Sequence, residues 1–408
     1  MELESNVSLL DRLDDFQVWE SYIERKKSLF PDDFRVAKFE FLMNSEECRA
    51  VAKGVIDGSY RYSDPIKKLI SKTNIKKKRA VYTFKDDEMM VLRIVASLLN
   101  DYDHLFSDNL YSFRRGNGVR NAIGRLKGLK QLGNMYVYKA DIHDYFNSID
   151  VADLLEGLHR DLCDERLYTF IEGILNNPYV VFNGERITEK KGVMAGTPIS
   201  PFLANYYLRD VDEFFNEQGC LYFRYADDIL ILSKDKDKLD EYRSMLHSKI
   251  AEKKLEMNPK KETFYNPGET FEFLGFSISE SKVDVSSTSI YKIKGKIRRS
   301  SKSIRRWMLR KKAPVNGTIR ALIRRYNHKF YGYEESEISW SKWFFPVITT
   351  SESLHVIDQY FQDWLRYIAS GKHSKKNYEL VSYETMKGCG YRPLVNEYYK
   401  SLKEKNDD

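Results

Sequence analysis

The chain has 408 residues, of which 42% are apolar and 14% aromatic, and it carries a net charge of +7. This length and composition allow two or three compact units with apolar cores. Its four cysteines (Cys48, Cys163, Cys220 and Cys389) form no CxxC pair, which argues against a disulfide framework or a zinc site and favours a reducing compartment. The N-terminus does not resemble a signal peptide, and no apolar run is long enough to span a bilayer. We therefore expect a soluble, cytoplasmic protein with no membrane partner.

The first segments predict helices followed by one strand. Residues from about 9 to 75 are expected to be mainly helical, because Phe16, Trp19, Tyr22 and Ile23 recur at helical spacing. The segment "KKKRAVYTF" predicts a strand that leaves a basic loop. The segment "DEMMVLRIVASLLNDY" predicts a buried helix, since its apolar face is almost continuous.

The central segments predict strands that end in polar residues. "NMYVYKAD" predicts a strand that ends at Asp141, and "SIDVADLLEGLHRDL" predicts a helix capped by Ser148 or Asp150. "GTPISPFLANYYLRDVDEFFNEQG" predicts a loop and then a helix, with Ser200 as the N-cap and Gly219 at the end. "LYFRYADDILILS" predicts a hairpin of two apolar strands around a short polar turn.

The last third of the chain is expected to be mainly helical after one further strand, "FEFLGFSIS". Strands and helices mix without strict alternation along the whole chain. This order predicts an α+β fold, in which an antiparallel sheet is backed by helices.

One segment carries most of the positive charge. Residues 291–330 contain fifteen Lys and Arg and no Asp or Glu, so the remainder of the chain has a net charge of −8. A run of one sign repels itself unless a partner neutralises it, and a phosphate backbone is a suitable counter-charge. A solvated basic helix is the alternative. Interleaved apolar residues indicate a folded, amphipathic element: Ile297, Ile304, Trp307, Met308, Ile319, Leu322 and Ile323.

Three carboxylates are expected at neighbouring strand ends. Asp227 and Asp228 occupy the hairpin tip, and Asp141 ends another apolar strand. Like charges about 4 Å apart repel by roughly 1 kcal/mol in water, and several-fold more near a protein surface. Such a group can instead hold two Mg²⁺ ions roughly 3.5–4 Å apart, which activate a hydroxyl and stabilise a leaving phosphate. A solvated surface pair is the alternative, but the flanking apolar strands favour a site at the edge of a core.

Six segments resemble, in order, the motifs of reverse transcriptases. "YADD" is similar to the signature hairpin of this family, "DIHDYFNSI" to its first palm motif and "KGVMAGTPISPFLANYYL" to its second. "MNPKKETF" resembles the lysine-bearing motif, "FEFLGF" the primer-grip strand, and "LYSFRRGNG" the finger motif of bacterial and group II intron-type enzymes. The resemblance covers residues from about 76 to 278. One departure is Ala195, which stands where many relatives carry glutamine.

The resemblance implies an RNA-directed DNA polymerase that uses dNTPs and makes cDNA on an RNA template. Asp141, Asp227 and Asp228 would hold two Mg²⁺ ions, or Mn²⁺ as a substitute, with help from the carbonyl of Ile142. Lys261, or its neighbour Lys260, would act on the leaving pyrophosphate. The residues implied to bind the nucleotide are Lys78, Arg79, Asp144, Tyr145, Phe146, Gly196 and Pro198, with Arg93 as a further candidate. Those implied to bind nucleic acid are Arg114, Lys296, Arg298, Arg299, Arg305 and Arg306.

Phe146 falls where the family places a bulky ring under the sugar. Such a ring would clash with a ribose 2′-hydroxyl and so favour dNTPs, which disfavours an RNA-dependent RNA polymerase. The alternative is that Phe146 is a core phenylalanine.

The same resemblance implies a right-hand polymerase with fingers, a palm and a helical thumb. The expected divisions are an N-terminal helical extension (1–75), fingers (76–138), a palm (139–284, with a finger-side insertion near 151–190), a basic helical thumb (285–335) and a C-terminal thumb extension (336–408). Lys372, His373, Lys375 and Lys376 lie beside aromatic residues in the last segment, which predicts either RNA binding or a folded thumb cap.

The biological role is expected from analogy with stand-alone bacterial reverse transcriptases. The chain shows no nuclease, protease or RNase H segment, which favours cDNA synthesis on a dedicated noncoding RNA, encoded nearby, in antiphage defence. A group II intron or retron enzyme is the alternative, as is a non-catalytic, maturase-like RNA-binding protein. The intact Asp141, Asp227 and Asp228 argue against the last.

Overall fold

The computed structural model describes residues 7–29, 34–71, 78–332 and 339–404. The chain divides into two compact units, one of residues 1–28 and 33–267 and the other of residues 29–32 and 268–408. None of the helices in the described ranges combines the length and the apolar content that crossing a membrane requires.

The first unit begins with a group of packed helices. Trp19, Tyr22 and Ile23 are buried as expected, whereas Phe16 is 45% exposed. The predicted buried helix is confirmed, since Met90 and Val91 on α4 are fully buried. The group consists of η1 (Leu9–Leu13), α1 (Phe16–Leu29), α2 (Phe34–Met43), α3 (Glu46–Ile56), α4 (Asp86–Leu98) and η2 (Leu99–Leu105). The chain then continues through α5 (Val119–Gly128) and η3 (Leu132–Asn134).

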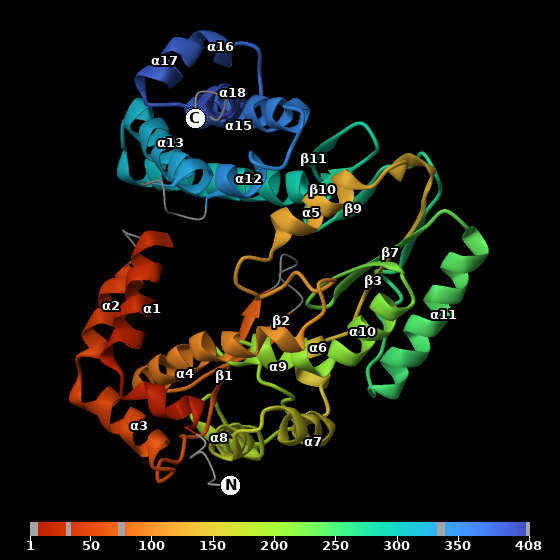
Figure 1. Cartoon of the computed structure of the whole chain (residues 1–408). Helices are drawn as coiled ribbons and strands as arrows, with labels where there is room; N and C mark the ends of the chain where they lie inside the picture. Colours follow the sequence, from red (N-terminus) through yellow and green to blue (C-terminus); the bar gives the residue numbers. More distant parts are fainter. Residues whose placement is uncertain (1–6, 30–33, 72–77, 333–338, 405–408) are drawn as a thin grey trace, which may run out of the picture. The chain divides into compact units, whose positions relative to one another are not determined.

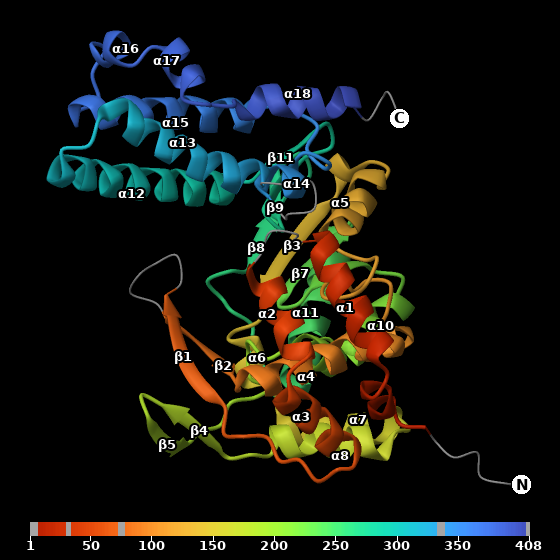
Figure 2. The ribbon, with the colours of Figure 1, turned by 90° about the vertical axis from the view of Figure 1, so that its left-hand side faces the viewer.

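A four-stranded sheet follows these helices, in the order β2-β1-β4-β5 (Figure 2). The first strand lies inside the segment that was expected to be helical, because "IKKLIS" pairs antiparallel with β2 along its whole length. The predicted insertion near 151–190 supplies two helices and two adjacent strands, β4 and β5, of which β5 lies at the edge of the sheet. The elements are β1 (Ile66–Ser71), β2 (Lys78–Thr83), α7 (Val151–Asp161), α8 (Glu165–Leu175), β4 (Tyr179–Phe182) and β5 (Glu185–Thr188).

The second sheet of this unit is the predicted antiparallel sheet, in the order β6-β7-β3-β8. Helix α11 packs against β7 and β3, and α10 packs against β6 (Figure 1). Asp150 caps α7 as expected, whereas Ser200 is the first residue of α9 and not its N-cap. The elements are β3 (Tyr136–Asp141), α6 (Tyr145–Ser148), α9 (Ser200–Tyr207), α10 (Arg209–Glu217), β6 (Leu221–Tyr225), β7 (Asp228–Ser233), α11 (Lys236–Glu252) and β8 (Thr263–Tyr265).

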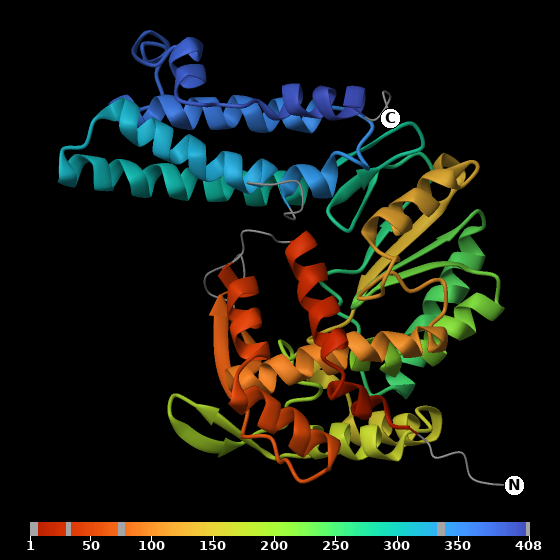
Figure 3. The ribbon, with the colours of Figure 1, turned by 60° about the vertical axis from the view of Figure 1, so that its left-hand side comes forward.

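The second unit combines a small antiparallel sheet with long helices. Helices α12, α13 and α15 pack side by side (Figure 3). The sheet was expected in the palm, but Ser289 donates to the carbonyl of Gly275 and Ser353 to the carboxylate of Asp284, which ties the strands to these helices. The elements are β9 (Phe271–Phe273), β10 (Phe276–Ile278), β11 (Val283–Val285), α12 (Ser287–Lys311), α13 (Val315–Tyr331), α14 (Trp340–Phe344), α15 (Glu352–Ser370), α16 (Asn377–Leu380), α17 (Tyr383–Gly388) and α18 (Leu394–Glu404).

The predicted basic segment forms α12 and α13. Ile293 and Ile297 are buried on the inner side of α12, while Trp307, expected in the apolar face, is 46% exposed. The segment that contains His373 is folded, because its ring packs on Trp364 and Tyr367. The amphipathic character of the basic segment is therefore confirmed.

Candidate active site

The three predicted carboxylates meet at one edge of the palm sheet. Asp141 ends β3 and pairs directly with Asp228, the first residue of β7. Asp227 precedes Asp228 in the turn, and its carbonyl accepts a hydrogen bond of 3.2 Å from the amide of Ile142. Residues paired across antiparallel strands lie about 4.5–5.5 Å apart. The expected convergence of Asp141, Asp227 and Asp228 is thus present in the strand register.

The hairpin turn between β6 and β7 is tight. Tyr225 pairs with Asp228, so only Ala226 and Asp227 form the loop. Ala226 has a φ of 56°, which is unfavourable for a residue with a Cβ. Its amide donates to Ser112 Oγ at 2.9 Å. This bond from a neighbouring loop helps to hold the turn in its strained conformation.

A lysine ammonium satisfies one of the three carboxylates. Lys261 Nζ lies 2.5 Å from Asp141 Oδ2, and the Asn258 side-chain amide donates to Asp141 Oδ1 at 3.2 Å. The Asp141 side chain is only 5% exposed, while that of Lys261 is 56% exposed. The lysine can therefore move away through solvent, whereas the aspartate is fixed. The predicted assignment of Lys261 to the site, in preference to Lys260, is consistent with this contact.

The electrostatics of the group favour a bound cation. Burial, together with the neighbouring Asp141 and Asp228 carboxylates, raises the pKa of Asp227 to about 6, although Lys261 opposes the shift. Within the described ranges, no three acidic, His or Cys side chains are already arranged as a metal site. At Asp141, the ammonium of Lys261 occupies the position of a cation beside the carboxylate. The donor set of clustered carboxylates fits the hard, oxygen-seeking Mg²⁺ ion.

We expect Mg²⁺ to raise the thermal midpoint of the protein at pH 7.5, and to raise it less as the pH falls through 6. The pKa of Asp227 in the folded chain, about 6, exceeds that of an unfolded aspartate, about 3.9. Without metal, the stability that this group contributes is therefore full below about pH 4 and is lost as the pH rises through 6. Mg²⁺ offsets the loss, and protons compete with it.

Thermal melts with and without Mg²⁺ across pH 5–8 would measure this effect. Asp227→Asn is the matched variant, and it should melt higher than the wild type at pH 7.5 without metal. A Mg²⁺ effect that does not depend on pH would contradict the assignment.

A cavity of about 760 Å³ opens beside the carboxylates. This volume lies within the range of small-molecule sites, about 300–1,000 Å³. Both acidic and basic groups line it, a combination that suits a polyanion held near metal ions. The lining residues are Lys78, Arg79, Asp141, Ile142, His143, Asp144, Tyr145, Phe146, Asn147, Asp227, Asn258, Pro259, Lys260 and Lys261.

Phe146 sits in the cavity wall on the short helix α6. The guanidinium of Arg79 lies over its ring, 5.9 Å from the centroid. The preceding Tyr145 is buried, and its hydroxyl donates to the carbonyl of Ala204 on α9. Phe146 is half-buried and does not belong to the deep core. The hydrogen bond of Tyr145 anchors the backbone that precedes it.

Gly192 is a site residue that the sequence reasoning missed. A Cβ at this position would lie 2.3 Å from the carbonyl oxygen of Phe146, and its φ is +51°. The next residue, Val193, donates its amide to that same carbonyl at 2.9 Å. Only glycine permits this approach, which fixes the backbone under the Phe146 ring. Gly192 could have been found from the sequence, because it lies in the segment that resembles the second palm motif.

Some residues implied to bind the nucleotide lie elsewhere. Gly196 and Pro198 are not among the residues that line the cavity. A Cβ on Gly196 would come within 3.0 Å of the Tyr82 carbonyl, so this glycine permits close packing against β2. Arg93 lies under the ring of Phe39 and also does not line the cavity.

Arg114, which was expected to contact nucleic acid, has a structural role instead. Its guanidinium forms a two-bond pair with the Asp103 carboxylate and donates to the carbonyls of Ser107 and Leu110. The side chain is only 9% exposed. A motif match does not reveal that a cation is already neutralised within the fold.

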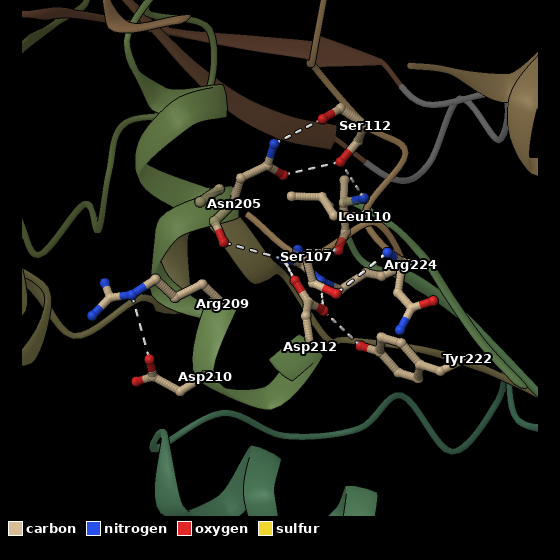
Figure 4. A network of polar contacts seen from close by, with 12 residues as sticks. Ser107, Leu110, Ser112, Asn205, Arg209, Asp210, Asp212, Tyr222 and Arg224 are labelled. Carbon is tan, nitrogen blue, oxygen red and sulfur yellow. Dashed lines mark hydrogen bonds and ion pairs between the residues drawn. The ribbon is translucent and has the colours of Figure 1, made fainter. Parts of the chain in front are cut away.

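A buried polar network of Arg224, Asp212, Tyr222 and Asn205 lies beside the hairpin (Figure 4). Arg224 on β6 is fully buried and pairs with Asp212 on α10, which also accepts from the Tyr222 hydroxyl at 3.0 Å. Arg224 further donates to the carbonyls of Asn205 and Ala226. The network therefore reaches the turn that carries Asp227. A charged residue within an apolar strand was its signal in the sequence.

The amide of Asn205 extends the same network to the loop that precedes α5. Asn205 Nδ2 donates to the carbonyl of Ser112 at 2.7 Å, and Ser112 Oγ donates to Asn205 Oδ1 at 2.9 Å. Ser112 is the residue that holds the amide of Ala226. The network therefore holds the turn at two atoms of Ala226: Arg224 donates to its carbonyl, and Ser112 Oγ accepts from its amide.

The other basic residues expected to bind nucleic acid belong to the second unit, on α12. Lys296, Arg298, Arg299 and Arg306 are exposed. Arg305 differs, because its guanidinium packs against Gly371 at the end of α15, where a Cβ would lie 2.4 Å from Arg305 Cζ. The first four remain candidates for phosphate contacts, while Arg305 connects two helices.

Comparison with known families identifies this arrangement. Residues 70–278, just over half of the chain, match the family model described as "Reverse transcriptase (RNA-dependent DNA polymerase)". The chain belongs to the reverse transcriptase family. The matched span includes all the residues of the carboxylate group and of the cavity. The family resemblance of the motifs is thereby confirmed.

Among individual proteins, the chain is similar to the group II intron-encoded protein LtrA of Lactococcus lactis subsp. cremoris, with 27% identity over 42% of this chain and 28% of LtrA. It is also similar to the retron Ec86 reverse transcriptase of Escherichia coli, with 28% identity over 41% of this chain and 49% of that protein. The chain thus matches less than half the length of either relative.

Solved structures give weaker matches. Telomerase from Candida tropicalis superposes with a TM-score of 0.45 and 13% identity over 81% of this chain and 69% of that one. Telomerase from Candida albicans, in complex with a fragment of telomeric RNA, gives a TM-score of 0.44 and 14% identity over 81% of this chain and 62% of that one.

Proposed function

We propose that the protein is an RNA-directed DNA polymerase that transfers nucleotides at the carboxylate group. The observation that carries the proposal is a cavity that Asp141 and Asp227 line together with the basic residues Lys78 and Arg79. Asp228 pairs with Asp141 at the adjoining strand end. Two Mg²⁺ ions bound by the carboxylates would supply charge stabilisation to the attacking 3′-hydroxyl and the leaving pyrophosphate.

The residues of the chain itself perform the remaining tasks. Lys78 and Arg79 would neutralise the triphosphate, and Lys261, released from Asp141, would stabilise or protonate the leaving pyrophosphate. The rigid palm sheet holds the carboxylates before substrate arrives, so that little reorganisation accompanies reaction.

A primer-extension assay tests the proposal directly. The purified chain, Mg²⁺ and dNTPs should extend a DNA primer on an RNA template, with template-dependent incorporation of each nucleotide. No extension on either RNA or DNA templates, in Mg²⁺ or Mn²⁺, would refute it and favour a non-catalytic RNA-binding protein.

Replacing Phe146 with Val should raise the incorporation of rNTPs relative to dNTPs. The half-buried ring lines the nucleotide cavity, and the bonds of Tyr145 and Val193 hold the backbone that carries it. In this proposal the ring excludes a 2′-hydroxyl by steric contact. A steric exclusion of this kind is worth about 1–3 kcal/mol, or roughly 10–200-fold in selectivity. Single-turnover incorporation of each nucleotide gives the ratio, with Phe146→Tyr as the control that keeps the bulk. An unchanged ratio in the Val variant would leave Phe146 as a packing residue.

We further propose that α12 binds the template–primer duplex through its phosphates. The exposed Lys296, Arg298 and Arg306 lie on a helix without acidic residues. Each phosphate contact that is lost should reduce the slope of log affinity against log salt concentration by about 0.7–0.9.

The triple variant Lys296→Gln, Arg298→Gln, Arg306→Gln should therefore bind an RNA–DNA duplex more weakly and with a slope smaller by about 2–3. The control carries the same loss of charge on other elements: Lys53→Gln, Lys236→Gln, Lys403→Gln. A normal slope in the α12 variant would assign this basic surface to another partner.

The template, in our proposal, is one dedicated noncoding RNA encoded near the gene, and its cDNA serves antiphage defence. What supports this is a positively charged helical unit large enough to hold a structured RNA. Sequencing of the RNA that co-purifies from the host, with and without phage, tests the idea. One dominant small RNA with cDNA copied from part of it would support the proposal. A heterogeneous pool would contradict it, and a spliced intron would favour the group II intron alternative.

A further inference from the structure

Phe113 is a large apolar side chain whose exposure the fold does not explain. Its ring is 51% exposed, although it belongs to a loop between buried residues of the first unit. Its φ is 56°, a conformation that is a genuine outlier for a bulky residue. An exposed ring on strained backbone is more consistent with a functional position than with packing.

The two neighbours of Phe113 prevent the loop from relaxing. Ser112 is fully buried and bonded to Asn205 and to the amide of Ala226. Arg114 is bound in two bonds to the Asp103 carboxylate. The backbone is thus fixed on both sides of Phe113, which directs the ring outward.

The ring lies between two aromatic residues of the active site. Its centroid is 6.4 Å from that of Phe146, at an interplanar angle of 87°, and 6.2 Å from that of Tyr225, at 45°. Phe146 lines the nucleotide cavity, whereas Phe113 does not. Tyr225 immediately precedes the turn that carries Asp227 and Asp228. Phe113 therefore bridges from the nucleotide cavity to the hairpin tyrosine.

We propose that Phe113 is a positioning residue that packs against the base of the 3′-terminal primer nucleotide. This inference rests on the proposed polymerase function, because the primer's 3′-hydroxyl must then lie beside the three carboxylates. The nucleotide that bears this hydroxyl would occupy the space next to the incoming nucleotide, beside Phe113 and Tyr225. An exposed aromatic ring suits a nucleobase of any sequence, since every base has a π-face.

Two variants separate the ring from its backbone. Phe113→Gly removes the ring and relieves the unfavourable φ, while Phe113→Tyr keeps the ring. If the ring positions the primer end, the Gly variant should extend a matched primer about 5–100-fold more slowly, the range expected for loss of one base–aromatic stack. The Tyr variant should restore extension. Thermal melting of both variants reports any general effect on folding.

A primer that ends in an abasic nucleotide distinguishes direct contact with the base from a purely structural role of Phe113. This primer lacks the base that the ring would contact, so the wild type and Phe113→Gly should extend it at equal, slow rates. The two changes would then be non-additive, as expected for direct partners. Equal penalties from Phe113→Gly on normal and abasic primers, or no penalty on either, would overturn the inference. The wild type is assayed on a matched primer in the same experiment. If it extends no primer, the proposed polymerase function fails, and not only the role of Phe113.

Discussion

Changing both Asp227 and Asp228 to Asn is expected to abolish primer extension while the protein stays folded. A loss of at least about 1,000-fold, or about 4 kcal/mol of transition-state stabilisation, is the expected scale. In the proposed mechanism the two side chains would provide anionic oxygen ligands next to Asp141, and an amide is a much weaker ligand for Mg²⁺. Single-nucleotide incorporation under single-turnover conditions measures the effect.

The same change should not weaken folding or binding of nucleic acid. Burial and the adjacent carboxylates already disfavour ionised Asp227, so removing charge there relieves repulsion in the metal-free protein. We expect the variant to melt at least as high as the wild type without metal. Its affinity for an RNA–DNA duplex should be nearly unchanged, because the proposed phosphate contacts lie on α12.

A matched control is available in the exposed pair Asp14 and Asp15, which also consists of two adjacent aspartates. Asp14→Asn with Asp15→Asn alters net charge by the same amount and should leave extension intact. Substantial extension by the Asp227 and Asp228 double variant would show that nucleotidyl transfer occurs elsewhere on the chain.

The local part of this site could be predicted from sequence. Apolar strands that end at Asp141 and surround the pair Asp227–Asp228 define a hairpin and a strand end through short-range patterns alone. Their convergence from two neighbouring strand ends was also predicted, and in the structure β3 pairs with β7 so that Asp141 lies opposite Asp228. The same holds for the amphipathic α12, whose buried face recurs at helical spacing.

The features that could not be predicted depend on contacts between residues that are distant in the sequence. The segment 66–71 is a strand because β2 and β4 pair with it, although residues around it favour helices. Arg114 and Arg305 have the charge of nucleic-acid contacts, but Asp103 and Gly371 engage them within the fold. Gly192 matters because the Phe146 backbone approaches it. In each case the deciding neighbour is distant in sequence.

The buried pair of Arg224 and Asp212 leads to the second large effect. Both side chains are fully buried, and each would be left as an uncompensated charge if its partner were removed. Such losses cost about 3–5 kcal/mol. Arg224→Met and Asp212→Leu should therefore each lower the stability of the first unit by this amount in denaturant titrations. The exposed pair Lys238–Glu241 serves as the control, and its removal should cost no more than about 1 kcal/mol.

The double variant Arg224→Met, Asp212→Leu separates stability from positioning. Replacing both charges with apolar groups should recover part of the lost stability, since no buried charge remains. Recovery is incomplete because Leu is larger than Asp and the Tyr222 hydroxyl loses its acceptor. Extension should not recover to the same degree, because Arg224 also donates to the carbonyls of Asn205 and Ala226. Those bonds connect α9 to the turn that carries Asp227, and their loss leaves the strained Ala226 with support from Ser112 alone within this network. We therefore expect a stable protein with reduced kcat and a nearly normal KM for dNTP. Recovery of both stability and kcat would show that the network only stabilises the fold and does not position the turn.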